Sequence, residues 1–161
     1  MIKEADISLC GKFRYSLTRS WNERKPVIMF VMLNPSKADG LVDDATIRVC
    51  IKRANQLGGG SLLVCNLGAY RATSPEVWKR VKDPEGPLNF GVLEQSLIEV
   101  QSKGGIVIAA WGNHGSFKQL DVKFLHLAYQ AGISLFCLGV TKSGQPKHPL
   151  YVSLSQPLLN Y

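Results

Sequence analysis

The sequence predicts an α/β protein: a three-layer α/β/α domain with a central, mainly parallel four-stranded sheet and one further strand at its N-terminal edge. Short, continuous apolar runs, which are typical of strands buried on both faces, alternate with segments of helical periodicity. This alternation favours right-handed crossovers between parallel strands. No linker or internal repeat interrupts the 161 residues, so we expect residues 1–161 to form a single domain.

Four apolar runs are the candidate core strands. They comprise residues 26–33, 61–67, 106–111 and 133–138. Each run is short, and its length and apolar content are those of a strand in the middle of a parallel sheet. Residues 13–19 (FRYSLTR) are instead rich in β-formers that alternate with polar side chains, which predicts the strand at the N-terminal edge.

Helices are expected between these strands. Residues 44–57 carry apolar side chains at helical spacing, and three successive glycines then end the helix. Ser74 followed by Pro75 indicates the start of a short helix, because proline is favoured in a first helical turn. The remaining predicted helices are residues 88–101 and 117–130.

Net charge and hydropathy limit the possible partners. The formal net charge of +7 makes DNA a candidate partner, and a solvated basic surface without a partner is the alternative. No apolar stretch approaches the roughly 20 residues of a membrane-spanning helix, so we expect no membrane partner. The amino terminus lacks the apolar segment of a secretory signal, which predicts a cytoplasmic protein, and no obligate protein partner is evident.

The sequence contains no pattern for a metal or organic cofactor. Two CxxC pairs would indicate a zinc site, but none occurs among Cys10, Cys50, Cys65 and Cys137. The histidines are too scattered to form a metal set, and the phosphate-binding GxxxxGK[ST] and GxGxxG motifs are absent, as is the GxSxG nucleophile elbow. We therefore expect the protein to act without a cofactor.

Unusual polar segments follow all four predicted core strands. They are residues 34–36, 66–71, 111–114 and 141–149. In open parallel sheets, ligands bind outside the carboxyl ends of the strands, where these segments meet. The sequence therefore predicts a ligand site at that edge of the sheet.

In order and type, these segments resemble the motifs of the uracil-DNA glycosylase superfamily. The run Leu33-Asn34-Pro35-Ser36 resembles the Asn-Pro form of the first motif in the mismatch-specific branch. Asn66, with Arg71 beyond it, is similar to the second motif. The third motif, an apolar run that ends in Trp-Gly, resembles Trp111-Gly112, and the last resembles His148-Pro149.

The resemblance implies hydrolysis of the N-glycosidic bond of an extruded base. That reaction needs a positioned water, a donor for the departing base anion and a base pocket. Asn34 would orient the water and His148 would donate to the anion. Asp44 is an alternative catalytic base, together with Asp39 and Asp43 in the same loop. Loop solvation and capping of the helix that starts near residue 45 are the alternative roles of these carboxylates.

Base and DNA contacts are expected from the remaining motif residues. Asn66 offers both a donor and an acceptor, as the Watson–Crick edge of a pyrimidine requires. The further candidate base-binding residues are Pro35, Ser36 and Trp111, of which Trp111 has strand-end packing as its alternative role. Arg71 and Lys147 are candidate phosphate contacts or, alternatively, solvated surface residues.

The closest overall resemblance is to a bacterial and phage domain family of unknown function. Its signatures NPSxAD, NLxAYRAT, AWGxHG and GQPxHPLY all occur here. The small polar segment after Asn34 would admit a bulky base. We therefore expect a DNA glycosylase for a modified pyrimidine, such as glucosylated hydroxymethylcytosine in antiviral defence. A non-catalytic nucleotide or modified-base binding module and a hydrolase of free nucleosides or nucleotides are the alternatives.

Overall fold

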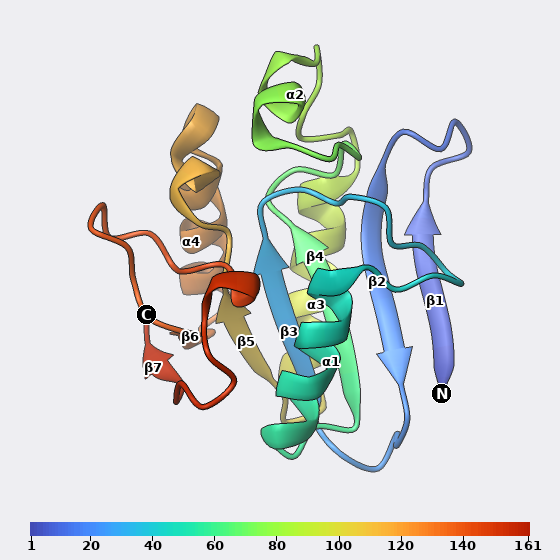
Figure 1. The fold of residues 1–161 in the computed structure, drawn as a ribbon, viewed down its shortest axis with the longest axis vertical. Coiled ribbons are helices and arrows are strands. Elements are labelled where there is room, and N and C mark those ends of the chain that lie inside the picture. The colour runs from blue at the N-terminus through green and yellow to red at the C-terminus, as the bar shows by residue number, and fades with distance from the viewer.

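A computed structural model describes residues 1–161 as one mixed sheet of seven strands with helices on both faces (Figure 1). The strand order is β1-β2-β4-β3-β5-β6-β7. Its four central strands are parallel, as predicted: β3 (Val27–Met32), β4 (Ser61–Asn66), β5 (Ile106–Ala109) and β6 (Leu135–Cys137). Every residue of β3 and β4 is buried, which accounts for their continuous apolar sequences.

The edges of the sheet differ from the prediction. The expected N-terminal edge strand, β2 (Arg14–Ser20), is an inner strand, because β1 (Ile2–Ile7) pairs with it on the side away from β4. At the other edge, β7 (Leu159–Asn160) pairs antiparallel with β6. Both edge strands are mostly exposed, so neither shows the apolar pattern of a buried strand. The prediction of four parallel strands plus one edge strand was therefore wrong outside the parallel centre.

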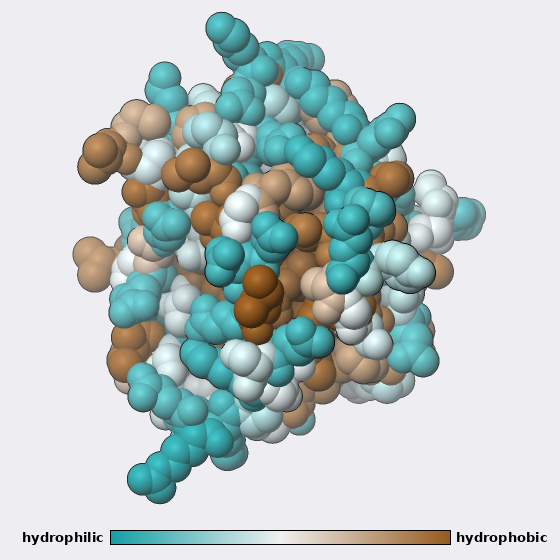
Figure 2. All heavy atoms as spheres, turned by 180° about the vertical axis from the view of Figure 1, so that it is seen from behind, coloured by the Kyte–Doolittle hydropathy of each residue, from teal (hydrophilic) through white to brown (hydrophobic).

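The predicted helices are all present and make the outer layers. The first, α1 (Ala45–Gln56), covers one face of the sheet, and Ile47, Cys50 and Ala54 are its core residues there. On the opposite face lie α3 (Asn89–Ser102) and α4 (Leu120–Gln130). Figure 2 shows the molecule from behind, where hydrophilic residues surround a central area that contains hydrophobic ones.

Two short helices lie at the carboxyl edge of the central strands. One is α2 (Pro75–Arg80), which Ser74 caps through a hydrogen bond from the Val77 N–H, and which stands above the sheet in Figure 1. The other is the 3₁₀ helix η1 (Asn113–Gln119) that precedes α4. Because Lys118 takes a positive φ of 51°, α4 begins three residues later than its sequence pattern predicts.

The order of the parallel strands places a possible ligand crevice. Counted along the chain, β3, β4, β5 and β6 stand in the spatial order 2-1-3-4, so the direction of winding reverses between β3 and β5. At such a switch point the two neighbouring connections leave toward opposite faces and open a crevice at the carboxyl ends of the strands. None of the helices is long and apolar enough to cross a lipid bilayer.

Candidate functional site

A cleft of about 830 Å³ lies at the carboxyl ends of β3 and β5, where the topology places the crevice. Its volume is in the range of small-molecule sites. Six residues selected from the sequence line it: Asn34, Ser36, Asp44, Trp111, Lys147 and His148. Three others lie outside its lining: Pro35, Asn66 and Arg71. The four strand-end segments therefore do converge, although not every motif residue faces the space between them.

Asn34 presents a free carbonyl oxygen to this cleft. It follows β3 directly, and its Nδ2 donates to the backbone oxygens of Ala72, at 2.9 Å, and Pro35, at 3.1 Å. Both amide hydrogens are thereby used, whereas Oδ1 accepts no hydrogen bond from the protein. A free acceptor of fixed orientation can bind a hydrogen of a water molecule and direct the water's lone pair elsewhere.

His148 presents a free donor to the same cleft. Its Nδ1 accepts the Leu150 backbone N–H at 3.3 Å, so the neutral ring carries its proton on Nε2. Burial lowers the pKa of His148 below its ordinary value, and the negative charge of Asp44 offsets part of this effect. The imidazole is therefore neutral at pH 7, with its Nε2–H unpaired within the protein.

Asp44 is the one carboxylate of the loop between β3 and α1 that lines the cleft. It is the N-cap of α1, because its Oδ1 accepts the Ile47 N–H at 2.9 Å, and it also lines the cleft. Its second oxygen, Oδ2, accepts no hydrogen bond. The capping role expected as an alternative is thus present, and one oxygen of the carboxylate stays available to a ligand.

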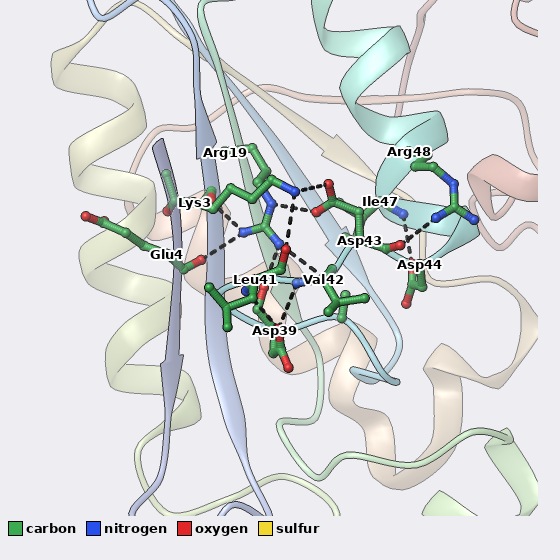
Figure 3. Close-up of polar contacts among 12 residues, drawn as sticks. Lys3, Glu4, Arg19, Asp39, Leu41, Val42, Asp43, Asp44, Ile47 and Arg48 are labelled. Atoms are coloured by element: carbon green, nitrogen blue, oxygen red, sulfur yellow. Dashed lines mark hydrogen bonds and ion pairs between the residues drawn. The ribbon is translucent and has the colours of Figure 1, made fainter. Parts of the chain in front are cut away.

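Asp39 and Asp43 instead hold the loop in place (Figure 3). The carboxylate of Asp43 accepts hydrogen bonds from Arg19 and Lys3, both at 2.7 Å. Asp39 caps the backbone N–H groups of Leu41 and Val42, which lowers the pKa of Asp39. Neither carboxylate lines the cleft, so the geometry gives no support to the prediction of these two as alternative bases.

Arg19 is the centre of this arrangement. Its side chain on β2 is fully buried, and besides Asp43 it donates to the backbone oxygens of four residues: Glu4, Thr18, Asp39 and Val42. Figure 3 shows β1, β2 and the loop meeting at this guanidinium. The contacts fix the loop between Asn34 and the N-cap Asp44.

Arg14 is a cleft residue that the sequence analysis missed. It is 2% exposed, and it donates to the Ala38 backbone oxygen at 2.8 Å and to Asn66 Oδ1 at 3.4 Å. Burial lowers the pKa of Arg14 to about 10, which still leaves it charged at pH 7. The one sequence feature that could have indicated Arg14 is the presence of an arginine near each end of β2, a short strand that packs against the core.

Asn66 takes a supporting position in place of the expected contact with a base. It is 1% exposed and outside the cleft lining, and its Oδ1 accepts from the cleft residue Arg14. Its backbone oxygen accepts from Asn89 Nδ2 at 2.8 Å. Because of these contacts, Asn66 acts on the cleft through Arg14.

The segment that carries His148 is held on both sides. Upstream, Gln145 accepts from Trp111 Nε1 at 2.8 Å and donates to Asp121 Oδ2 at 2.9 Å. Downstream, the buried Arg53 of α1 donates to the backbone oxygens of Ser153 and Gln156. These contacts position the short 3₁₀ helix η2 (Pro149–Tyr151) and the histidine that caps it.

Trp111 combines a packing role with a place in the cleft wall. The indole is 2% exposed and packs edge-on against Phe124 and Tyr161. Gly115 is required beside it, because a Cβ there would stand 2.0 Å from the indole Cδ1. The packing alternative weighed for Trp111 is therefore present, and it leaves the indole little surface on which a base would stack.

Of the two predicted phosphate contacts, Lys147 lines the cleft and Arg71 does not. Lys147 is exposed, lines the cleft and has a free Nζ. Arg71 lies outside the lining, half-buried, where it donates to the backbone oxygens of Ser36 and Gly11. Pro35 is buried, and its carbonyl oxygen accepts the Ala72 N–H at 2.9 Å.

The fold and cleft define the class: an α/β protein with a cleft at a topological switch point. The chain belongs to the family described as a protein of unknown function, DUF1643, whose model matches residues 14–150. No curated protein and no solved structure matches the chain. The expected membership of a family of unknown function is confirmed, and the likeness to the glycosylases stays a prediction.

Proposed function

We propose that the protein is a DNA glycosylase, which hydrolyses the N-glycosidic bond of an extruded pyrimidine and leaves an abasic site. One observation carries this proposal. The free acceptor Asn34 Oδ1 and the free donor His148 Nε2 reach the same switch-point cleft from the segments after two different strands. These are the two groups that the reaction needs, and the resemblance of the motifs to those of the glycosylases agrees with them.

The chemistry requires no strong base at Asn34. As the glycosidic bond breaks, its electron pair leaves with the base and the sugar becomes a cation, which a water held by Asn34 attacks at C1′. The water gives up its proton late, to solvent. His148 donates from Nε2 to the carbonyl oxygen on which the negative charge of the base develops, and fixed donors of this kind lower the barrier.

The mouth of the cleft suits DNA. Leu150 and Tyr151 line the cleft beside His148, and 42% and 84% of their surfaces are exposed. Apolar side chains of this kind can enter the gap that an extruded base leaves in the stack. Lys147 and the net charge of +7 provide attraction for the phosphates.

The size of the cleft favours a base with a large substituent. A volume of about 830 Å³ is enough for a drug-sized ligand and exceeds what a lone pyrimidine ring fills. Ser36 adds a hydroxyl group that no protein atom engages and that could bind a polar substituent. A glucosylated hydroxymethylcytosine, as found in phage DNA, is a base of this kind, and its removal would serve antiviral defence.

The test compares variants of the two central residues on DNAs that contain different pyrimidines. Asn34→Ala and His148→Ala should still bind DNA, and His148→Ala should form abasic sites about 10²- to 10³-fold more slowly. His126→Ala, on the exposed side of α4, and Asn55→Ala, at the end of α1, are matched controls that should keep full activity. Full activity of His148→Ala would refute the proposed mechanism. Wild-type protein that binds modified bases without cleaving them would establish a binding module instead.

A further inference from the structure

Arg14 brings an uncompensated charge to the cleft. Its guanidinium is buried and is part of no salt bridge, and Arg14 is one of the residues that line the cleft. Of its five donor hydrogens, one binds Ala38 O and one binds Asn66 Oδ1, and the buried Nε has no partner. Buried charge and unpaired donors are costly, so a ligand that brings acceptors would complete this environment.

Asp44 supplies the complementary group. Both residues line the cleft, and no salt bridge joins their side chains. The negative charge of Asp44 raises the pKa of Arg14 against the effect of burial. Because Oδ1 is used in capping α1, Oδ2 is the free acceptor. Between them, Arg14 and Asp44 therefore offer a ligand in the cleft several donors and one acceptor.

This pattern selects among possible ligand groups. A phosphate would meet the repulsion of Asp44. Uracil and thymine alternate acceptor, donor and acceptor along the Watson–Crick edge, so their central N3–H would oppose a guanidinium that only donates. Cytosine has two adjacent acceptors, N3 and O2, followed by an amino donor at C4.

We propose that Arg14 and Asp44 determine specificity by recognising the Watson–Crick edge of a cytosine-type base. Arg14 donates to N3 and O2, and Asp44 Oδ2 accepts from the exocyclic amino group. This inference rests on the proposed function for the identity of the ligand as an extruded base. Substituents at C5 lie away from this edge, so cytosines modified there fit the same contacts and extend into the rest of the cleft.

A single substitution should change this preference without disturbing the helix. In Asp44→Asn the side-chain oxygen can keep capping α1, because asparagine is as good an N-cap as aspartate. The amide nitrogen then stands where Oδ2 was, so a donor replaces the acceptor. A donor there favours the O4 of uracil over the amino group of cytosine. Glu76→Gln is the matched control, since it removes another carboxylate from the cleft lining.

The experiment measures nucleoside binding and abasic-site formation separately. Calorimetry compares deoxycytidine and 5-hydroxymethyldeoxycytidine with deoxyuridine, and DNAs carrying the same bases are assayed for cleavage. We expect the wild type and Glu76→Gln to prefer the cytosine type by about 5- to 150-fold, and Asp44→Asn to lose or reverse that preference.

Two results would overturn the inference: a wild-type preference for deoxyuridine, or an unchanged preference in Asp44→Asn. Loss of all cleavage in Asp44→Asn, with the binding preference intact, would also overturn it and make Asp44 the catalytic base. If the nucleosides bind with the expected preference and no DNA is cleaved, the glycosylase proposal fails and the recognition by Arg14 and Asp44 stands.

Discussion

At the scale of single residues, hydrogen bonds decide which atoms of the cleft are free to act. Asn34 donates both amide hydrogens to backbone oxygens, and its side-chain oxygen accepts no hydrogen bond. His148 accepts a hydrogen bond at Nδ1, and its Nε2–H has no partner in the protein. Asp44 divides its two oxygens between a helix cap and the cleft. Motifs show which residue types meet at a strand end, but not which atom of each remains unpaired.

The protonation of His148 provides a test at this scale. Burial lowers the pKa of His148 and Asp44 raises it, so NMR titration of the ring should give a pKa below 6.5, and a still lower one in Asp44→Asn. Because the folded-state pKa is lowered, this group contributes stability above its unfolded pKa, and the contribution is lost as the pH falls through the folded value. A pKa above 6.5, or one that rises in Asp44→Asn, would contradict the described surroundings of the ring.

At the scale of elements, the loop between β3 and α1 has a defined shape because β1 and β2 hold it. The buried Arg19 binds the loop through Asp43 and through the backbone oxygens of Asp39 and Val42. This explains why a strand as exposed as β1 belongs to the structure: Lys3 and the Glu4 carbonyl oxygen complete the same cluster.

Removal of the Asp43 charge should therefore destabilise the protein. Asp43→Asn leaves Arg19 without its carboxylate, and we expect the free energy of unfolding at pH 7 to fall by about 1.5–3 kcal/mol in urea denaturation. Burial raises the pKa of Asp43, but the hydrogen bonds from Lys3 and Arg19 lower it by more. The stabilisation is hence present above the ordinary aspartate pKa and is lost as the pH falls through the folded value.

Two measurements check this explanation of the Asp43 effect. The difference between the wild type and Asp43→Asn should shrink as the pH falls from 7 through the ordinary aspartate pKa, because the unfolded wild-type chain then binds a proton that the native carboxylate, with its lowered pKa, does not. Glu99→Gln breaks the exposed pair with Lys103 and should cost within about 0.5 kcal/mol. Equal effects of both substitutions, or a difference that does not depend on pH, would show that Asp43 does not act through buried charge.

At the scale of the whole molecule, the sequence predicted what depends on local pattern. The runs in β3 and β4 are apolar on both faces, and α1 and α4 carry an apolar stripe, so the parallel centre and its helices followed. The strand-end segments converge because the four strands that precede them are parallel, so that their carboxyl ends lie at the same edge of the sheet. The exposed strands β1 and β7 were missed because pairing with a neighbour, and not their composition, places them in the sheet.

The position of the cleft could be predicted from the sequence, but only some of the residues that line it could. Asn34 and His148 follow from strand ends, whereas Arg14 comes from the start of an antiparallel strand, which no rule about parallel strands would select. Asn66 was placed at the correct strand end, but its side chain is buried against Arg14. The direction of a side chain depends on tertiary packing, and the sequence pattern alone does not determine it.

The central claim is that this cleft releases a base from DNA, and the most direct test detects the base itself. The protein is incubated with phage DNA rich in glucosylated hydroxymethylcytosine and, in parallel, with uracil-containing DNA. The amount of free base, measured by mass spectrometry of the small-molecule fraction, is then compared with the number of abasic sites. The account predicts free modified base in a one-to-one ratio with abasic sites, and about 10²- to 10³-fold less of both with His148→Ala. The account would be contradicted if the protein bound DNA but neither DNA yielded free base or abasic sites.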